Sequence, residues 1–190
     1  MDDGDRVIHC GSFNKSLYAS LRIGYVVMPD ALRPALCQLR ATTGRSNSLV
    51  EQLALASFLR AGGLSRHLRI SRNVYLRRRD IVLAALRSVL GEHLRVSGEH
   101  AGFHFVLWLP DGVAEHQVVR AGMDASLALQ GLSEFCRERR LPPALVIGYA
   151  AAQDDLLRGA AMRLGQEIAA LIQPGGTNPV TSSSKPAMLR

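Results

Sequence analysis

The chain has 190 residues, enough for one ordinary domain or for part of a larger one, and 47% of them are hydrophobic, which excludes a wholly disordered chain. The 23 lysines and arginines outnumber the 16 acidic residues, so the net charge is +7. Such a charge is typical of nucleic-acid-binding proteins. However, only Lys15 and Lys185 are lysines, and we interpret the excess of arginine as a composition bias rather than as a nucleic-acid-binding surface.

The three cysteines, Cys10, Cys37 and Cys136, are widely spaced and include no Cys-x-x-Cys pair. The sequence therefore predicts neither a disulfide framework nor a zinc site, and it fits a reducing cytoplasm. The acidic first residues lack the basic and apolar regions of a signal peptide. No apolar run approaches the roughly 18 residues that cross a bilayer, so we expect no membrane partner.

Two apolar segments flank a loop of small residues near the start of the chain. Residues 7–10 are expected to form a buried strand, and residues 23–28 a second strand. The loop between them holds Lys15. A lysine beside buried strands loses hydration, and its amine can then act as the nucleophile that Schiff-base chemistry requires. Ser12 and Arg22 offer a hydroxyl donor and a planar charged fork, which are the groups that hold a phosphate.

This segment resembles the cofactor-lysine segment of fold-type I pyridoxal-phosphate (PLP) enzymes, the class I and II aminotransferases. The strongest likeness is to the aminotransferase-like domain of MocR-type GntR transcriptional regulators. The matching residues are Val7-Ile8, Gly11-Ser12-Phe13, Lys15, Leu17, Leu21-Arg22, Gly24-Tyr25 and Pro29. The resemblance implies that Lys15 is the catalytic lysine that binds PLP covalently, and that Ser12 and Arg22 grip the cofactor phosphate.

Two helices are predicted after the second strand. The first begins near Asp30 and ends near residues 42–44. The second begins after Ser48, with Glu51 as its reciprocal capping partner, and the glycines within residues 61–63 end it.

A long helix is predicted from about residue 64 to residue 90. Its apolar stripe, with spacings of three, four and seven residues, comprises Leu64, Leu68, Tyr75, Val82, Leu86 and Val89. The arginines around the stripe are Arg66, Arg69, Arg72, Arg77, Arg78, Arg79 and Arg87. A basic helix could bind DNA, but we interpret these arginines as a solvated face, and no helix-turn-helix pattern precedes them. Residues 75–86 resemble the MocR-type helix that joins the large PLP domain to the small one.

Short strands and helices alternate in the predicted C-terminal half. Strands are expected at residues 94–96, 103–109, 126–129 and 144–150, and helices at residues 114–122 and 153–172. Residues 103–109 again resemble a strand of the same family. His104 could be a metal ligand or a base, but no second ligand stands at a metal-binding spacing, so we expect a packed or edge histidine and no metal. From residue 174 onward Gly, Pro, Ser and Thr dominate, which predicts disorder.

These elements predict an α/β protein that resembles the C-terminal part of a fold-type I PLP-dependent transferase, with a truncated large domain and an α+β small domain. Residues 1–63 would be the remnant of the large PLP-binding domain, and residues 64–91 the connecting helix. Residues 92–173 would form the small aminotransferase-like domain, and residues 174–190 a disordered tail.

The chain departs from the family pattern in two respects. In the family, the aromatic residue that stacks on the pyridine ring and the aspartate that pairs with its nitrogen lie upstream of the cofactor lysine, and neither has a counterpart here. Many aminotransferases also carry an arginine that pairs with the substrate carboxylate, whereas Val146 stands at the matching position. We therefore do not expect catalysis by this chain alone, and its status as an enzyme stays open.

Three functions are consistent with these observations. The first is a PLP-binding, aminotransferase-like effector domain of a GntR/MocR-type regulator. It would bind PLP and an amino-compound effector in the cytoplasm, leave DNA binding to another domain, and form a homodimer in intact relatives. The second is part of a class I/II aminotransferase, and the third is a folded remnant without cofactor. We favour the first for the ancestry of the chain, and the third stays open for what this chain does alone.

Overall fold

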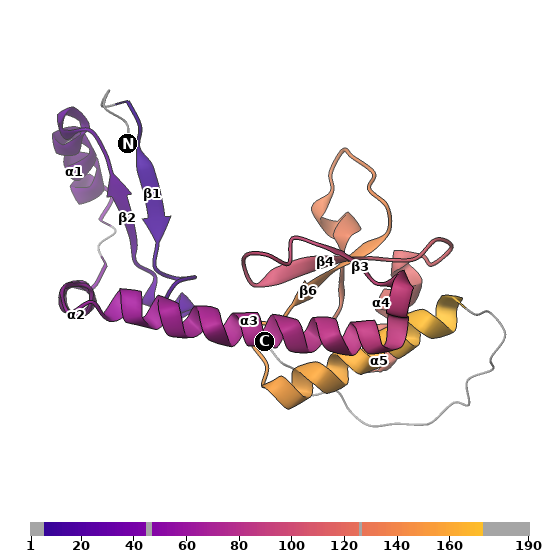
Figure 1. Ribbon diagram of the computed structural model, residues 1–190. Helices are drawn as coiled ribbons and strands as arrows, with labels where there is room; N and C mark the ends of the chain where they lie inside the picture. The colour runs from indigo at the N-terminus through magenta and orange to yellow at the C-terminus, as the bar shows by residue number, and fades with distance from the viewer. Residues whose placement is uncertain (1–5, 45–46, 126, 173–190) are drawn as a thin grey trace. The chain divides into compact units, whose positions relative to one another are not determined.

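The computed structural model describes residues 6–44, 47–125 and 127–172, so the tail expected from residue 174 lies outside the described residues. Contacts divide the chain into two units, Met1–Arg72 and Asn73–Arg190, and the division falls inside the long helix α3. Figure 1 labels the helices and strands in chain order. No helix within the described ranges is both long and apolar enough to cross a membrane.

The first unit begins with a two-stranded antiparallel hairpin and continues with helices (Figure 1). Its strands are β1 (His9–Ser12) and β2 (Gly24–Val27), with the 3-10 turn η1 (Ala19–Leu21) in the connection between them. Its helices are η2 (Asp30–Leu32), α1 (Arg33–Thr42), α2 (Leu49–Arg60) and the first part of α3 (Gly63–Leu90). The Ser48 half of the predicted reciprocal cap of α2 is present, because Ser48 Oγ accepts a hydrogen bond from the Glu51 N–H at 3.5 Å. The hydrogen bonds of the described residues do not include the reciprocal one, from the Ser48 N–H to the Glu51 carboxylate.

Both hairpin strands are exposed, so the prediction of a buried strand at residues 7–10 is wrong. A two-stranded ribbon leaves two faces and two edges open, and no further layer of described residues covers them. The buried apolar cluster of this unit consists of Leu21, Ile23 and Leu55. Exposed apolar side chains include Val26, Val27, Leu36, Leu39, Leu49, Val50 and Leu53. The first unit therefore has too small a core, among its described residues, to be stable alone.

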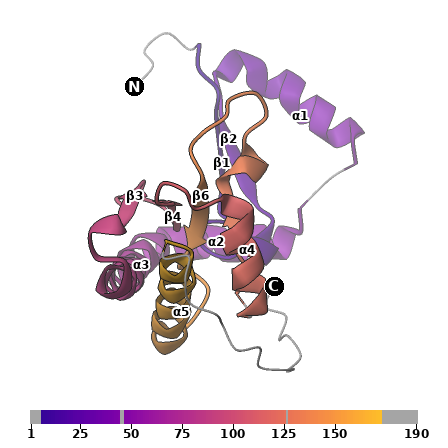
Figure 2. The same ribbon diagram turned by 90° about the vertical axis from the view of Figure 1, so that its right-hand side faces the viewer.

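The second unit is a four-stranded antiparallel sheet with helices packed against it (Figures 1 and 2). The strand order is β3-β4-β6-β5. The strands are β3 (Arg95–Ser97), β4 (His104–Trp108), β5 (Gln130–Gly131) and β6 (Ala144–Gly148). The helical segments after α3 are η3 (Gly91–His93), α4 (Glu115–Asp124), η4 (Leu132–Phe135) and α5 (Asp154–Ile172).

Alternate residues of β4 and β6 build the core of this unit. Phe105 and Leu107 in β4 are buried, as are Leu145 and Ile147 in β6, because successive side chains of a strand point to opposite faces. The side chains packed against them from α3, α4 and α5 include Leu86, Val118, Leu164 and Ile168. The predicted strands at residues 103–109 and 144–150 are thus confirmed, each one or two residues shorter at its ends.

The strand expected at residues 126–129 is wrong. Residues 127–129 are irregular, residue 126 lies outside the described residues, and pairing with β6 begins only at Gln130. The Leu127 N–H donates to the Gly122 carbonyl at 2.7 Å, which ties this segment to the end of α4 and away from the edge of β6.

The predicted apolar stripe of α3 is buried along only part of the helix. Leu86 and Val82 are buried in the core of the second unit, whereas Leu68 is 43% exposed. A periodic stripe shows which face of a helix is apolar, but the layers that cover this face lie elsewhere in the sequence.

Tyr149, just after β6, makes the stability of the second unit sensitive to alkali. Its hydroxyl donates to the Gly102 carbonyl at 2.9 Å, and its ring stacks on Phe105 at 6.0 Å. Burial raises the pKa of Tyr149 above the ordinary value of 10.0, and the charge of Arg79 offsets part of this rise. The stabilisation from the neutral phenol is therefore complete below pH 10 and is lost as pH rises through the raised pKa.

We expect Tyr149→Phe to flatten the fall in the free energy of unfolding above about pH 10. Urea unfolding at a series of pH values measures this slope. Tyr18→Phe is the matched control, because Tyr18 is 59% exposed. An unchanged slope in Tyr149→Phe would contradict the assignment.

Candidate functional site

The three residues predicted to bind the cofactor lie on one connection, at the same end of the β1–β2 hairpin. Ser12 is the last residue of β1 and pairs with Gly24. Lys15 lies in the turn that follows, and Arg22 comes directly after η1. One more hydrogen bond continues the pairing of β1 with β2, from the Phe13 N–H to the Ile23 carbonyl at 3.0 Å. The two ends of the connection therefore lie next to each other.

Local packing fixes the shape of this connection. The Leu17 N–H donates to the Phe13 carbonyl at 2.8 Å, which closes the turn around Lys15. Leu21 and Ile23 are buried against Leu55 of α2. Apolar side chains therefore anchor the second end of the loop, while Ser12, Lys15 and Arg22 stay exposed.

Two glycines are required beside the loop. A Cβ atom at Gly11 would overlap the ring of Tyr25, and a Cβ atom at Gly24 would lie 2.8 Å from the Gly11 carbonyl oxygen. Their absence of side chains lets the Tyr25 ring lie across the hairpin, 5.3 Å from the ring of Phe13. The Gly-Ser-Phe and Gly-Tyr motifs thus have a local structural role in addition to any role in binding.

Asn47 holds the backbone at Arg22, and sequence reasoning missed it. Arg22 adopts a left-handed conformation with φ of 51°, and its carbonyl accepts a hydrogen bond from Asn47 Nδ2 at 2.9 Å. Asn47 itself is held from both sides, since its carbonyl accepts from Gln52 at 3.0 Å and its Oδ1 accepts from Arg40 at 3.3 Å. The only sequence signal is an asparagine between two serines, directly before the helix predicted to begin after Ser48.

The polar groups of the loop fit a phosphate. Ser12 Oγ accepts a hydrogen bond from the Asn14 N–H at 3.2 Å, which leaves the serine proton free to be donated. The Arg22 side chain has no ion pair among the described residues, so the N–H groups of its guanidinium can donate to a phosphate. Asn14 Oδ1 is buried without a hydrogen-bond partner, so the loop also holds an unsatisfied acceptor.

The expected desolvation of Lys15 is not provided by the described residues. Lys15, Ser12 and Arg22 are all exposed, and so are the strands beside them. A pocket of about 250 Å³ does lie between the loop and α2, but Leu17, Tyr18 and Leu21 line it and none of the three predicted residues does. The expectation failed because burial of a loop depends on layers that the flanking apolar segments do not themselves contain.

The two C-terminal residues singled out from the sequence lie in the second unit. Val146 is at the centre of β6, where it pairs with Val106 and with Gln130. Its apolar side chain cannot form the two parallel hydrogen bonds that an arginine makes with a carboxylate. His104 is exposed at the end of β4, opposite Gly148. No group of three His, Cys, Asp or Glu side chains able to hold a metal ion occurs in the part of the chain that the structure describes.

The arginines of α3 are not all solvated, so that expectation is partly wrong. Arg77 pairs with Asp154 at 2.9 Å, and Arg78 pairs with the same carboxylate at 3.5 Å. Arg78 also donates to the Ala150 carbonyl, and Arg79 donates to the Glu99 carbonyl at 3.2 Å. The side chains of Arg78 and Arg79 are only 20% and 19% exposed. These two arginines tie α3 to neighbouring loops of the second unit.

Comparison with known proteins shows which proteins this chain is similar to. No family model matches the chain. The transcriptional regulator YdeL of Bacillus subtilis is 30% identical over 166 residues, which is 86% of this chain and 35% of that protein. The probable rhizopine catabolism regulatory protein MocR of Rhizobium meliloti is 29% identical over 92% of this chain and 36% of its own length. The chain is homologous to MocR-type transcriptional regulators with aminotransferase-like domains.

Another MocR-type relative is named for pyridoxine biosynthesis. This regulator, PdxR of Corynebacterium glutamicum, is 29% identical over 81% of this chain and 33% of its own length. The chain thus spans about a third of the length of these curated relatives.

Solved aminotransferases confirm the fold. Kynurenine aminotransferase of Pyrococcus horikoshii superposes with a TM-score of 0.77 at 22% identity, over 90% of this chain and 43% of that enzyme. LysN, an α-aminoadipate aminotransferase of Thermus thermophilus, gives a TM-score of 0.73 at 24% identity, over 87% of this chain and 42% of that enzyme. The predicted fold class is therefore confirmed, since the chain matches part of a fold-type I aminotransferase.

Proposed function

We propose that this chain is the PLP-binding, aminotransferase-like effector part of a GntR/MocR-type transcriptional regulator. The observation that carries the proposal is the loop holding Ser12, Lys15 and Arg22, in a chain homologous to such regulators. LysN, one of the superposed enzymes, was solved with a phosphopyridoxyl-leucine adduct, which supports PLP as the cofactor of the fold.

Each loop residue has a distinct part in this proposal. PLP supplies an aldehyde that combines reversibly with amines. Lys15 provides the amine that holds the cofactor, Ser12 donates its free hydroxyl proton to the phosphate, and Arg22 pairs with the phosphate through its guanidinium. An amino compound that competes with Lys15 for the aldehyde would then be the effector.

The contacts in the second unit favour a regulator over an aminotransferase. Val146 stands where many aminotransferases have the arginine that pairs with the substrate carboxylate. We therefore expect the chain to bind the carboxylate of an amino acid only weakly. Arg77, Arg78 and Arg79 are engaged by Asp154, Asp80 and backbone carbonyls, which argues against DNA reading by α3. DNA binding by another domain, a cytoplasmic location and a homodimer of the intact protein belong to the same proposal, as do the domain bounds predicted above.

A spectroscopic titration tests the proposal. We expect PLP to show a protein-dependent change in its visible absorbance when the chain is added, and an added amino acid to reverse this change without forming a 2-oxo acid. Accumulation of a 2-oxo acid would instead support the aminotransferase. A spectrum identical to that of PLP with free lysine at the same concentration would support the remnant without cofactor.

A further inference from the structure

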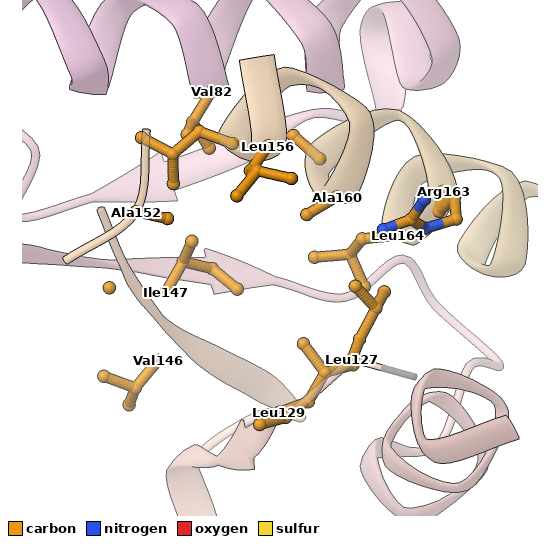
Figure 3. Close-up of a pocket in the computed structure, with 14 residues that line it drawn as sticks. Val82, Leu127, Leu129, Val146, Ile147, Ala152, Leu156, Ala160, Arg163 and Leu164 are labelled. Atoms are coloured by element: carbon orange, nitrogen blue, oxygen red, sulfur yellow. The ribbon is translucent and has the colours of Figure 1, made fainter. Parts of the chain in front are cut away.

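A pocket of about 280 Å³ lies in the second unit, beside α5, and no residue of the Lys15 loop lines it (Figure 3). Its walls come from α3, from the irregular segment 127–129, from the end of β6 and from the first half of α5. The apolar side chains around it include those of Val82, Leu127, Leu129, Ile147, Leu156 and Leu164. We call it the α5 pocket.

The α5 pocket exists because β5 is short. Pairing between β5 and β6 stops at Val146, so the edge of β6 beyond that residue has no neighbouring strand. Leu129 packs against Gly122 of α4, where it occupies the space of the missing Cβ atom, and this contact holds the segment away from β6. On the opposite wall, the small residues Ala152 and Ala160 leave the space between segment and helix unfilled.

One charged side chain borders this apolar space. Arg163 of α5 lines the pocket (Figure 3). No carboxylate of the described residues forms an ion pair with it, although Glu167 follows one helical turn later. By contrast, Asp154 at the start of the same helix is already paired with Arg77 and Arg78.

We propose that the α5 pocket binds a small monocarboxylate with an apolar chain, which fills the pocket while its carboxylate pairs with Arg163. Small-molecule sites are mostly apolar concavities with a few polar groups that fix orientation, and this volume lies just below the range for drug-sized ligands. The guanidinium favours an anionic ligand over a cationic one. The apolar walls favour an anion with a hydrocarbon chain over free phosphate or sulfate. The proposal does not depend on PLP.

Calorimetric titration of the full chain with a series of straight-chain carboxylates tests this proposal, without PLP present. Affinity should rise about fourfold for each added methylene from butanoate to octanoate, because each group removed from water adds a constant increment. Octylammonium has the same tail and the opposite charge, and it should bind more weakly than octanoate. Affinity that does not depend on chain length, or equal binding of the two head groups, would overturn the proposal.

Variants of α5 separate the roles of charge and cavity. Arg163→Gln should weaken octanoate binding about fivefold and remove the preference over octylammonium. Arg158→Gln is the matched control, since Arg158 is exposed on the same helix and does not line the pocket; it should leave the affinity unchanged. Ala160→Phe should fill the cavity and abolish binding, with circular dichroism confirming that the variant is folded. Equal effects of the two arginine variants would refute the role of Arg163.

Discussion

Replacing Lys15 by arginine is expected to abolish covalent capture of PLP by the chain under borohydride reduction, and replacing Lys185 by arginine is expected to leave it unchanged. The chain has only these two lysines, so each variant removes one of its two side-chain amines and leaves the other. Arginine keeps the positive charge but is never a nucleophile in a protein. Loss of capture would therefore come from the missing amine and not from a change in electrostatics.

The phosphate-binding groups explain why Lys15 should be preferred. Ser12 and Arg22 lie on the same connection as Lys15, and in the proposed site they would hold the phosphate and so raise the local concentration of the aldehyde near the Lys15 amine. Each of Ser12→Ala and Arg22→Gln should raise the PLP concentration needed for half-maximal capture by about tenfold, the usual scale for one charge-assisted hydrogen bond. Capture should stay weak even in the unchanged chain, because the described residues leave all three side chains exposed.

Peptide mapping of the borohydride-reduced protein identifies which lysine has bound PLP. The modified peptide should contain Lys15 in the unchanged chain and in Lys185→Arg. Modification found mainly at Lys185 would contradict the assignment of the site to Lys15. Stoichiometric binding by the chain alone at low PLP concentration would contradict the expectation that the site is incomplete.

Local rules in the sequence predicted most of the secondary structure. The N-cap bond from the Glu51 N–H to Ser48 Oγ is present, and α3 spans Gly63–Leu90 against an expected 64–90. The strand at residues 103–109 was recognisable because it is a strongly apolar run between turn-forming segments. Such features depend on residues a few positions apart, which is why a single sequence suffices to find them.

Features that depend on distant contacts could not be predicted in the same way. Apolar composition suggested buried strands around Lys15, but burial requires covering layers, which the described residues do not supply. Asn47 reaches the Arg22 carbonyl across 25 positions, and Arg78 reaches Ala150 across 72. A sequence does not reveal which arginines of a basic helix are bound, because the groups that bind them here are loop carbonyls and the carboxylate of Asp154 at the start of α5, all distant along the chain.

Phe105→Ala is expected to unfold or nearly unfold the second unit. Phe105 is 2% exposed and stacks on Tyr149, and truncating such a side chain costs about 3–5 kcal/mol of the free energy of unfolding. Most domains are stable by about 5–15 kcal/mol, so this one change removes a large fraction of the total. Trp108 follows Phe105 in the same strand and is the single tryptophan, so its fluorescence reports unfolding of this unit.

Leu68→Ala provides the matched contrast for this measurement. It truncates a large apolar side chain on the predicted stripe of α3, but Leu68 is 43% exposed and lies in the first unit. Its effect on the urea midpoint of Trp108 fluorescence should correspond to less than about 0.5 kcal/mol, as for most surface substitutions. A loss as large as that of Phe105→Ala would mean that the N-terminal half of α3 packs in the same cooperative unit as the sheet, contrary to the division of the chain at Arg72.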